Sequence, residues 1–197
     1  PGAQDTALVF RREDGVRRVW SWAELRNATA AARRGLVEAG VGAGDVVAAW
    51  MPNTPETVIV MLAAQSLGAV FTSTSPDFGP SGVLDRFGQV APKVLVAADG
   101  YVYGGKNHDR TEALAQIVRG LPTVQQVWLV HELDHDAEPE VHIRTRYLRD
   151  ILAVGVDDLE FVEMPFDAPG FILYSSGTTG APKCLVHRSA GLLLKHA

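Results

Sequence analysis

The feature that most constrains the fold is an alternation of strand-like and helix-like segments between residues 45 and 130. The apolar run DVVAAWM leads into a helical pattern that is capped by Thr54, has Pro55 in its first turn and ends at Gly68, and AVFT follows. Two further helical patterns lead to the runs KVLVA and VQQVWLV. Strands that are separated by helices run parallel, and right-handed crossovers cover both sheet faces. The sequence therefore predicts an α/β fold.

The segment before this alternation predicts a hairpin and a helix. Residues 6–22 contain the turn Glu13-Asp14-Gly15, and an Asp-Gly pair is a strong hairpin signal. Ser21 and Glu24 have the spacing of a capping box, in which each side chain binds a free backbone amide of the other. Gly40 ends this helix, and its apolar stripe consists of Trp22, Leu25, Thr29, Ala32 and Leu36.

After residue 130 the alternation of strand-like and helix-like segments is interrupted. The stretch from His131 to Glu140 is rich in acidic residues and lacks an apolar period, so we expect an exposed connection. A short helix from about Tyr147 to Leu152 follows it. The apolar strand GFILY then runs directly into SSGTTGAPK.

The strongest candidate site is YSSGTTGAPK, Tyr174 to Lys183. Gly177 and Gly180 allow tight turns that bring backbone amides close to a ligand. Lys183 adds a positive charge, and the hydroxyl donors are Ser175, Ser176, Thr178 and Thr179. Such a loop suits the oxygens of a polyphosphate. The alternative is a surface turn, because Ser, Thr and Gly are ordinary loop residues.

The loop differs from a Walker loop. The Gly-x4-Gly-Lys spacing is absent, and the residues that follow Lys183, CLVH, predict a strand where a Walker loop continues into a helix. We therefore expect the loop to join two strands of a hairpin.

The Ser/Thr/Gly loop followed by Pro-Lys resembles the phosphate-binding signature of the adenylate-forming superfamily, which includes acyl-CoA synthetases, luciferases and peptide-synthetase adenylation domains. Residues 44–70 are similar to the first Rossmann-like unit of these enzymes. Within the superfamily, SPDFG (75–79), residues 84–106 and LYSSGTTGAPK most resemble the acetoacetate:CoA ligase branch. The resemblance covers nearly the whole chain. It implies that residues 1–197 form the first part of a large AMP-binding amino-terminal domain with a Rossmann-like parallel sheet.

The resemblance implies an ATP-dependent reaction in two steps. A carboxylate, here acetoacetate, is first joined to AMP with loss of pyrophosphate, and the thiol of coenzyme A then displaces AMP. The loop and Lys183 would stabilise charge on the departing pyrophosphate. One loop threonine, Thr178 or Thr179, would lie near Mg²⁺. The loop that ends in Gly105 and Lys106 would contact a phosphate of CoA.

Some features depart from the family pattern. Cys184 stands where a small residue is common, and Ser189 stands where a second His or Thr is often found. The adenine-binding segment, the acidic Mg²⁺ ligand, the ribose-binding Asp and the catalytic lysine of a mobile carboxy-terminal domain are expected beyond Ala197. We therefore assign no catalytic residue within this chain, and we expect the chain to be an inactive fragment by itself.

A possible metal motif lies at His131 to His135, because HELDH fits H-E-x-x-H. That motif requires a helix, whereas this copy follows a strand and runs into acidic residues and Pro139. We expect both histidines to be solvent-exposed and to hold no zinc. Cys184 beside Lys183 could be a reactive thiol, but a lone cysteine in a strand is more often simply packed.

Composition excludes several classes of protein. The chain has 18 basic and 23 acidic residues and no basic stripe, which argues against nucleic-acid binding. Its longest charge-free span, residues 57–76, contains Gln65, Ser66 and Gly68 and is expected to be a buried helix and strand, not a membrane span. One cysteine rules out an intrachain disulfide and indicates a reducing compartment such as the cytoplasm.

Three alternatives stay open from the sequence. The chain could belong to another carboxylate activator, such as an acetyl- or propionyl-CoA synthetase, which acyl-pocket residues would distinguish. It could be a non-catalytic nucleotide-binding module, which the rest of the reading frame would distinguish. A zinc hydrolase built on HELDH would be recognised by its metal content.

Overall fold

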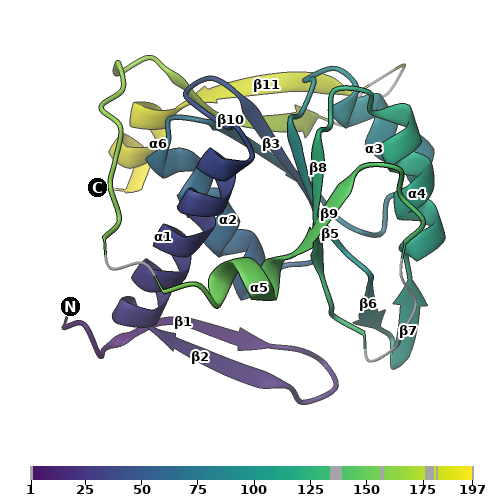
Figure 1. Ribbon diagram of the computed structural model, residues 1–197, viewed down its shortest axis with the longest axis horizontal. Helices are drawn as coiled ribbons and strands as arrows, with labels where there is room; N and C mark the ends of the chain where they lie inside the picture. The colour runs from purple at the N-terminus through teal and green to yellow at the C-terminus, as the bar shows by residue number, and fades with distance from the viewer. Residues whose placement is uncertain (1, 134–138, 156–157, 176–179, 181, 197) are drawn as a thin grey trace.

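The computed structural model describes residues 2–133, 139–155, 158–175, 180 and 182–196. Its centre is a sheet of seven strands in the order β11-β10-β4-β3-β5-β8-β9, with helices on both sides (Figure 1). The strands of this sheet are β3 Val46–Trp50, β4 Val70–Thr74, β5 Val94–Ala98, β8 Gln126–Val130, β9 Arg144–Tyr147, β10 Pro169–Ser175 and β11 Lys183–Arg188. The helices are α1 Trp22–Glu38, α2 Pro55–Ser66, α3 Pro80–Phe87, α4 Thr111–Gly120, α5 Leu148–Leu152 and α6 Ser189–His196.

The sheet is doubly wound. Strand β3 pairs in parallel with β4 on one side and β5 on the other, and β8 and β9 continue beyond β5. The chain thus reverses its direction across the sheet at β3, and ligands of such sheets bind at the edge where the strands end. Strand β10 joins β4 in parallel and β11 pairs antiparallel with β10. The predicted α/β fold is confirmed.

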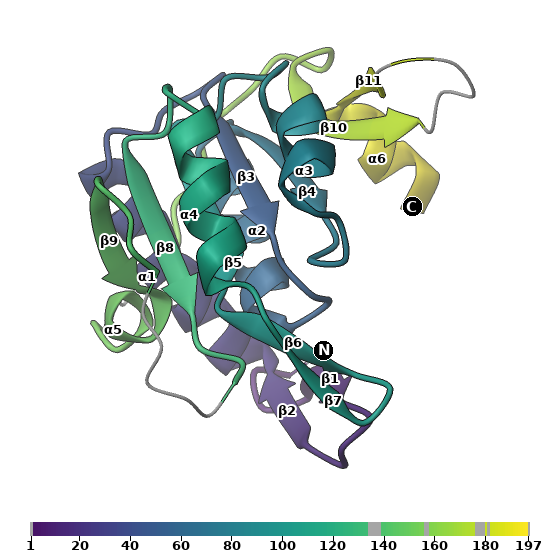
Figure 2. The same cartoon turned by 90° about the vertical axis from the view of Figure 1, so that its right-hand side faces the viewer.

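Each face of the sheet carries its own hydrophobic core. Residues of α1, α2 and α5 pack on one face, and residues of α3 and α4 pack on the other (Figure 2). Strand β3 contributes to both, since Val47 and Ala49 belong to the first cluster and Ala48 and Trp50 to the second. Successive side chains of a strand point to opposite faces of the sheet. Because both faces are covered here, every residue of the strand is apolar, and the sequence shows a continuous apolar run.

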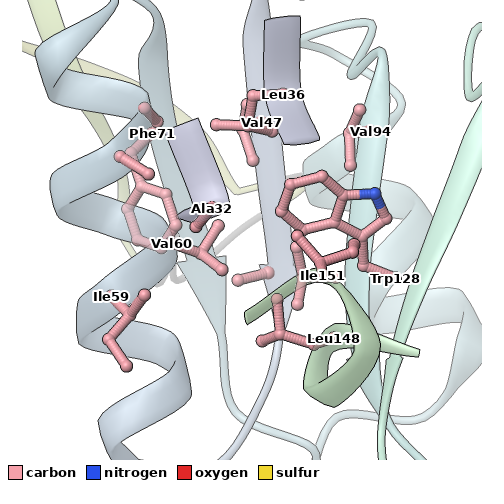
Figure 3. Packing of buried hydrophobic residues seen from close by; sticks show 14 of the residues in the cluster. Ala32, Leu36, Val47, Ile59, Val60, Phe71, Val94, Trp128, Leu148 and Ile151 are labelled. Carbon is pink, nitrogen blue, oxygen red and sulfur yellow. The ribbon is translucent and has the colours of Figure 1, made fainter. Parts of the chain in front are cut away.

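The first core depends on a close contact between α1 and the sheet. Trp128 of β8 lies beside Leu36 and Ile151 in this core (Figure 3). A Cβ atom at Gly35 would lie 2.8 Å from Cγ2 of Ile151 and 3.2 Å from the Trp128 ring. Glycine at this position therefore allows α1 to approach the indole. Nε1 of Trp128 donates a hydrogen bond to Oε1 of Gln126, at 2.7 Å, so the buried indole is satisfied.

Two small hairpins lie outside the main sheet. Strands β1, Thr6–Arg11, and β2, Arg17–Ser21, form the predicted amino-terminal hairpin. Strands β6, Gly100–Tyr103, and β7, Lys106–Asp109, form a second hairpin after β5. Strand β9 and the pairing of β6 with β7 carry no signal in the sequence, because these short, partly polar strands have no continuous apolar run.

The helix signals are confirmed with one correction. At the start of α1, Oγ of Ser21 accepts from N of Glu24 at 3.2 Å, and Oε2 of Glu24 accepts from N of Ser21 at 2.7 Å. Thr54 occupies the cap position of α2, but its side chain makes no capping hydrogen bond. Thr54 is instead buried, and its hydroxyl lies 3.5 Å from the Thr57 hydroxyl. In the part of the chain that the structure describes, no helix is long and apolar enough to cross a membrane.

Candidate functional site

The base of the predicted phosphate loop lies at the edge where the parallel strands end. Strand β10 ends at Ser175, β11 begins at Lys183, and these two residues pair in the register of the hairpin. The expectation that the loop joins two strands is therefore confirmed. Because β10 runs parallel to β4, the loop emerges at the sheet edge where doubly wound folds bind their ligands.

The structure describes only part of the loop itself. Ser175 is half-buried, Lys183 is exposed, and Gly180 has a φ of 117°, a left-handed conformation that favours glycine. The other four residues of the predicted phosphate site, Ser176, Gly177, Thr178 and Thr179, lie outside the described residues. Their assignment to phosphate or Mg²⁺ stays a prediction.

The strand that enters the loop is held firmly by β4. Oγ1 of Thr72 donates to the carbonyl oxygen of Ile172 at 2.8 Å, and it lies 3.0 Å from the hydroxyl of Tyr174. Burial raises the pKa of Tyr174 to about 12, against the opposing effect of its hydrogen bond with Thr72. Tyr174 thus remains a neutral hydrogen-bonding residue at the point where the chain leaves the sheet.

The second predicted ligand-contacting segment is the β6–β7 hairpin. Gly104 and Gly105 form its two-residue turn, and both have positive φ, 62° and 70°. Two left-handed residues are typical of the turn that matches the twist of a hairpin. N of Gly105 donates to Oε1 of Glu13 at 2.7 Å, so its amide already binds the β1–β2 turn. Lys106 begins β7 and is exposed.

The structure does not bring the hairpin and the loop base together. The β6–β7 hairpin and the β10–β11 pair lie at opposite ends of the molecule in both views (Figures 1 and 2). Any single ligand that contacts both must be long. The hairpin is instead anchored by Arg110, which donates to the carbonyl oxygen of Pro76 and to the hydroxyl of Tyr101, both at 3.0 Å.

The role of Arg110 as an anchor has no signal in the sequence. Burial raises the pKa of Tyr101, and a hydrogen bond to Asp77 raises it further, while Arg110 opposes both. Asp77 and Pro76 belong to the connection between β4 and α3, so the cluster joins that connection to the hairpin. An arginine directly before a helix carries no pattern that would have revealed this.

The expectation that His131 is a solvent-exposed loop residue is wrong. Its Nδ1 lies 3.0 Å from Oδ2 of Asp99, and its ring stacks on Tyr147 with the centroids 5.0 Å apart. The Asp99 side chain is fully buried, and its Oδ1 accepts from the backbone amides of Glu132 and Leu133. A buried carboxylate requires such donors, so the chain after β8 folds back onto the end of β5. The described residues include no group of three His, Cys, Asp or Glu side chains that could hold a metal ion, and His135 lies outside them.

Glu132 links the amino-terminal hairpin to the segment that follows β8. Its side chain is 6% exposed and lies 3.2 Å from Nη1 of Arg12 and 3.6 Å from Nη2 of Arg18. Burial raises the pKa of Glu132, and the charge of Glu56 adds to this, while the two arginines oppose the shift. The acidic stretch after β8 is therefore partly a structural element, in contrast to the expected exposed connection.

A large apolar groove opens on the side of α1 and α2. It has a volume of about 1400 Å³ and lies between these helices, the segment 159–166, β10, β11 and α6. Phe161 and Phe166 of that segment are 68% and 65% exposed. No local sequence pattern indicates this groove, because its walls come from elements that are far apart in the chain.

A doubly wound sheet with a glycine- and hydroxyl-rich loop at its carboxyl edge is typical of a nucleotide-binding enzyme domain. Residues 2–196 match the family model for AMP-binding enzymes, and the chain belongs to that family. This finding confirms the resemblance to the adenylate-forming superfamily.

Among curated relatives, an acetoacetyl-coenzyme A synthetase of Rhizobium meliloti is 45% identical over 194 residues, which cover 96% of this chain and 29% of the relative. The solved acetoacetyl-CoA synthetase from Streptomyces lividans superposes with a TM-score of 0.91 at 41% identity, over 97% of this chain and 29% of that chain. A malonamoyl-CoA synthetase of Penicillium aethiopicum is 34% identical, over 96% of this chain and 27% of the relative. The chain thus spans less than a third of the length of these proteins.

Proposed function

We propose that this chain is the first part of the AMP-binding amino-terminal domain of an ATP-dependent acid–thiol ligase. The observation that carries this proposal is the hairpin that brings Ser175 and Lys183 together at the carboxyl edge of a doubly wound sheet, in a chain that belongs to the AMP-binding enzymes. The protein would act in the cytoplasm, in keeping with its single cysteine.

The proposed substrate is acetoacetate. Relatives named for acetoacetyl-CoA and for malonamoyl-CoA support this choice, because the two acyl groups have nearly the same shape. Each carries a second carbonyl group beta to the activated carboxylate, and they differ only in a terminal methyl or amino group. The proposal therefore favours a short acid with a carbonyl at this position over plain acetate or propionate.

The proposed reaction has two steps. A carboxylate oxygen attacks the α-phosphorus of ATP, the bond to the bridging oxygen breaks, and pyrophosphate leaves. The CoA sulfur then attacks the acyl carbon, AMP leaves, and the thiol proton passes to solvent. In the first step, loop donors and Lys183 stabilise the charge that moves onto pyrophosphate.

Mg²⁺ is proposed to accompany ATP, with Thr178 or Thr179 near the ion. Both threonines lie outside the described residues, and the described residues provide no group of acidic or imidazole ligands for it. We therefore assign no step to the ion. CoA is proposed to contact Lys106 through one of its phosphates, and its pantetheine arm separates that phosphate from the thiol. The β6–β7 hairpin and the β10–β11 pair lie apart in Figure 1, which is compatible with a long ligand of this kind.

The loop assignment is tested by Lys183→Ala in the full-length protein. We expect acetoacetate-dependent exchange of pyrophosphate into ATP to slow by about 10²- to 10³-fold, which is the usual effect of removing one preorganised donor. Arg119→Ala removes an exposed cation from the end of α4 and serves as the matched control. Equal exchange rates for wild type and Lys183→Ala would contradict the assignment.

The substrate assignment is tested with a panel of acids. Acetoacetate and malonamate should support pyrophosphate exchange with the wild-type protein, and acetate and propionate should support it poorly. A preference for acetate or propionate would instead identify an acetyl- or propionyl-CoA synthetase. Absence of exchange with every acid would favour a non-catalytic nucleotide-binding module.

A further inference from the structure

One side chain outside the loop contacts the residues on both sides of Lys183. Gln89 lies just after α3, and its Nε2 donates to the carbonyl oxygen of Pro182 at 2.8 Å. Its Oε1 lies 3.5 Å from Sγ of Cys184, which donates to it. Pro182 and Cys184 flank Lys183 in the sequence, so one amide group holds the backbone before the lysine and the side chain after it.

The amide of Gln89 is itself held by α3, the helix that precedes it. Nε2 also donates to the carbonyl oxygen of Asp85 at 2.6 Å. A glutamine amide has two N–H donors, and both are used here, one toward α3 and one toward the loop. The side chain is therefore oriented before any ligand binds, although it lies at the surface.

Helix α3, which directly precedes Gln89, is packed against the rest of the fold. Phe87 is fully buried in the second core, and its ring lies 6.3 Å from the ring of Tyr174. The guanidinium of Arg86 lies 4.0 Å above the Phe78 ring and 6.0 Å from the Tyr174 ring. The α3 region thus contacts the strand that enters the phosphate loop through Tyr174 and the strand that leaves it through Gln89.

Lys183 needs such support because β11 is an edge strand. In the sheet that the structure describes, β11 pairs only with β10, and Ser175 and Lys183 form the last pair before the loop. The side of β11 that faces away from β10 has no neighbouring strand to fix it. Gln89 supplies a contact from a separate element, 93 residues away from Pro182 in the sequence.

We propose that Gln89 is a positioning residue that holds Lys183 where charge develops on the departing pyrophosphate. This inference rests on the proposed function and adds to it a residue from outside the loop. Gln89 acts through Lys183 and touches neither ATP nor the acid. Its loss should therefore impair the adenylation step and leave the thioester step unchanged, because pyrophosphate has left before CoA reacts.

The test is a double-mutant cycle in the full-length protein, with acetoacetate-dependent pyrophosphate exchange as the readout. We expect Gln89→Ala to slow exchange by about tenfold, since small displacements of a catalytic group have effects of this order or larger. In a Lys183→Ala background, Gln89→Ala should have no further effect, because a positioning residue has nothing left to position. Loss by the same factor in both backgrounds, or no loss in either, would overturn the inference.

Two further measurements separate positioning from general damage. Thioester formation from supplied acetoacetyl-adenylate should be equal for wild type and Gln89→Ala, and an equal loss in both half-reactions would overturn the inference. Gln89→Glu keeps the shape but loses both N–H donors, so it should be at least as slow as Gln89→Ala. Full exchange activity in Gln89→Glu would also contradict the inference.

A matched control is available on α4. Gln116 is an exposed helical glutamine. Its Nε2 donates to Oε1 of Glu112 at 3.4 Å, which is the one hydrogen bond of this side chain that the structure describes. Gln116→Ala should leave both half-reactions unchanged.

If the wild-type protein itself shows no acetoacetate-dependent exchange, the proposed function fails and this inference fails with it. If the wild type is active and the cycle is additive, only the inference fails.

Discussion

Among single residues, Glu132 is a carboxylate that is nearly buried beside two arginines. It follows β8, its side chain is almost fully buried, and it lies between Arg12 and Arg18 of the amino-terminal hairpin. Its ion pairs stabilise the charged form, but burial and the nearby Glu56 destabilise that form more, so its pKa is raised above 4.5. The folded protein therefore holds a proton on Glu132 more tightly than the unfolded chain does.

This difference makes a pH-dependent contribution to stability. Below pH 4.5, the contribution of Glu132 to the free energy of unfolding is fully present. As pH rises above 4.5, the unfolded chain loses the Glu132 proton first. The contribution is therefore lost as pH rises through the raised pKa of the folded state. We expect the stability of wild type relative to Glu132→Gln to fall as pH rises from 4.5 toward neutral, measured by urea unfolding.

Glu112→Gln, at an exposed position on α4, is the control for replacing a glutamate that is not buried. A relative stability of wild type over Glu132→Gln that rises with pH would mean that the two arginines dominate the environment of Glu132. The raised pKa would then be wrong.

At the scale of elements, the β6–β7 hairpin carries the proposed CoA contact. The hairpin is held at two places: Glu13 binds the Gly105 amide in its turn, and Arg110 joins Tyr101 of β6 to Pro76. The exposed Lys106 is thus presented on a rigid support, where an ammonium group can reach a phosphate without being buried.

Lys106→Ala in the full-length protein should raise the apparent KM for CoA and leave adenylation intact. One exposed charge pair contributes at most about 1 kcal/mol, which corresponds to a change of about fivefold. The effect should decrease with added salt, because exposed charges are screened. Slower pyrophosphate exchange with an unchanged KM for CoA would contradict the assignment.

The elements that could be predicted from the sequence are those with a repeating physical signal. Helix α1 has its capping box, and β3, β5 and β8 have continuous apolar runs because helices cover them on both sides. Strand β9 lies at the edge of the sheet and has the sequence RTRY, which has no such run. Its position depends on pairing with β8, and a partner distant in sequence leaves no local pattern.

In the candidate site, too, some residues can be predicted from a local sequence pattern and others cannot. The loop residues Ser175 to Lys183 were found because their composition and spacing are unusual by themselves. Gln89 and Arg110 were not found, because each is an ordinary polar residue whose role comes from residues that the fold brings close. His131 was assigned to solvent for a related reason, since its partner Asp99 lies 32 positions earlier.

At the scale of the whole molecule, the apolar groove beside α1 and α2 brings together exposed side chains from distant parts of the chain. Its walls include Trp22 of α1 and Leu173 of β10, which are 44% and 49% exposed, as well as Phe161 and Phe166. Exposed apolar side chains that gather in one groove are a liability for aggregation.

We therefore expect the 197-residue chain to bind a hydrophobic dye such as ANS while it is folded. Phe161→Ser with Phe166→Ser should reduce the dye fluorescence and slow self-association, because these side chains line the groove. Val9→Ser, on the amino-terminal hairpin outside the groove, is the control and should leave both unchanged. Dye fluorescence that persists in the Phe double variant would locate the apolar surface elsewhere.

The central position of β3 has a consequence for synthesis on the ribosome. Of the main-sheet strands that the structure describes, β3 comes first in the chain, and both of its neighbours, β4 and β5, follow it. Until β4 emerges, the apolar segment VVAAW has no partner on either side, and such unpaired strands associate readily with other chains. The nascent chain is therefore most vulnerable to misassembly during the synthesis of α2, and a chaperone that binds short apolar segments would act in that interval.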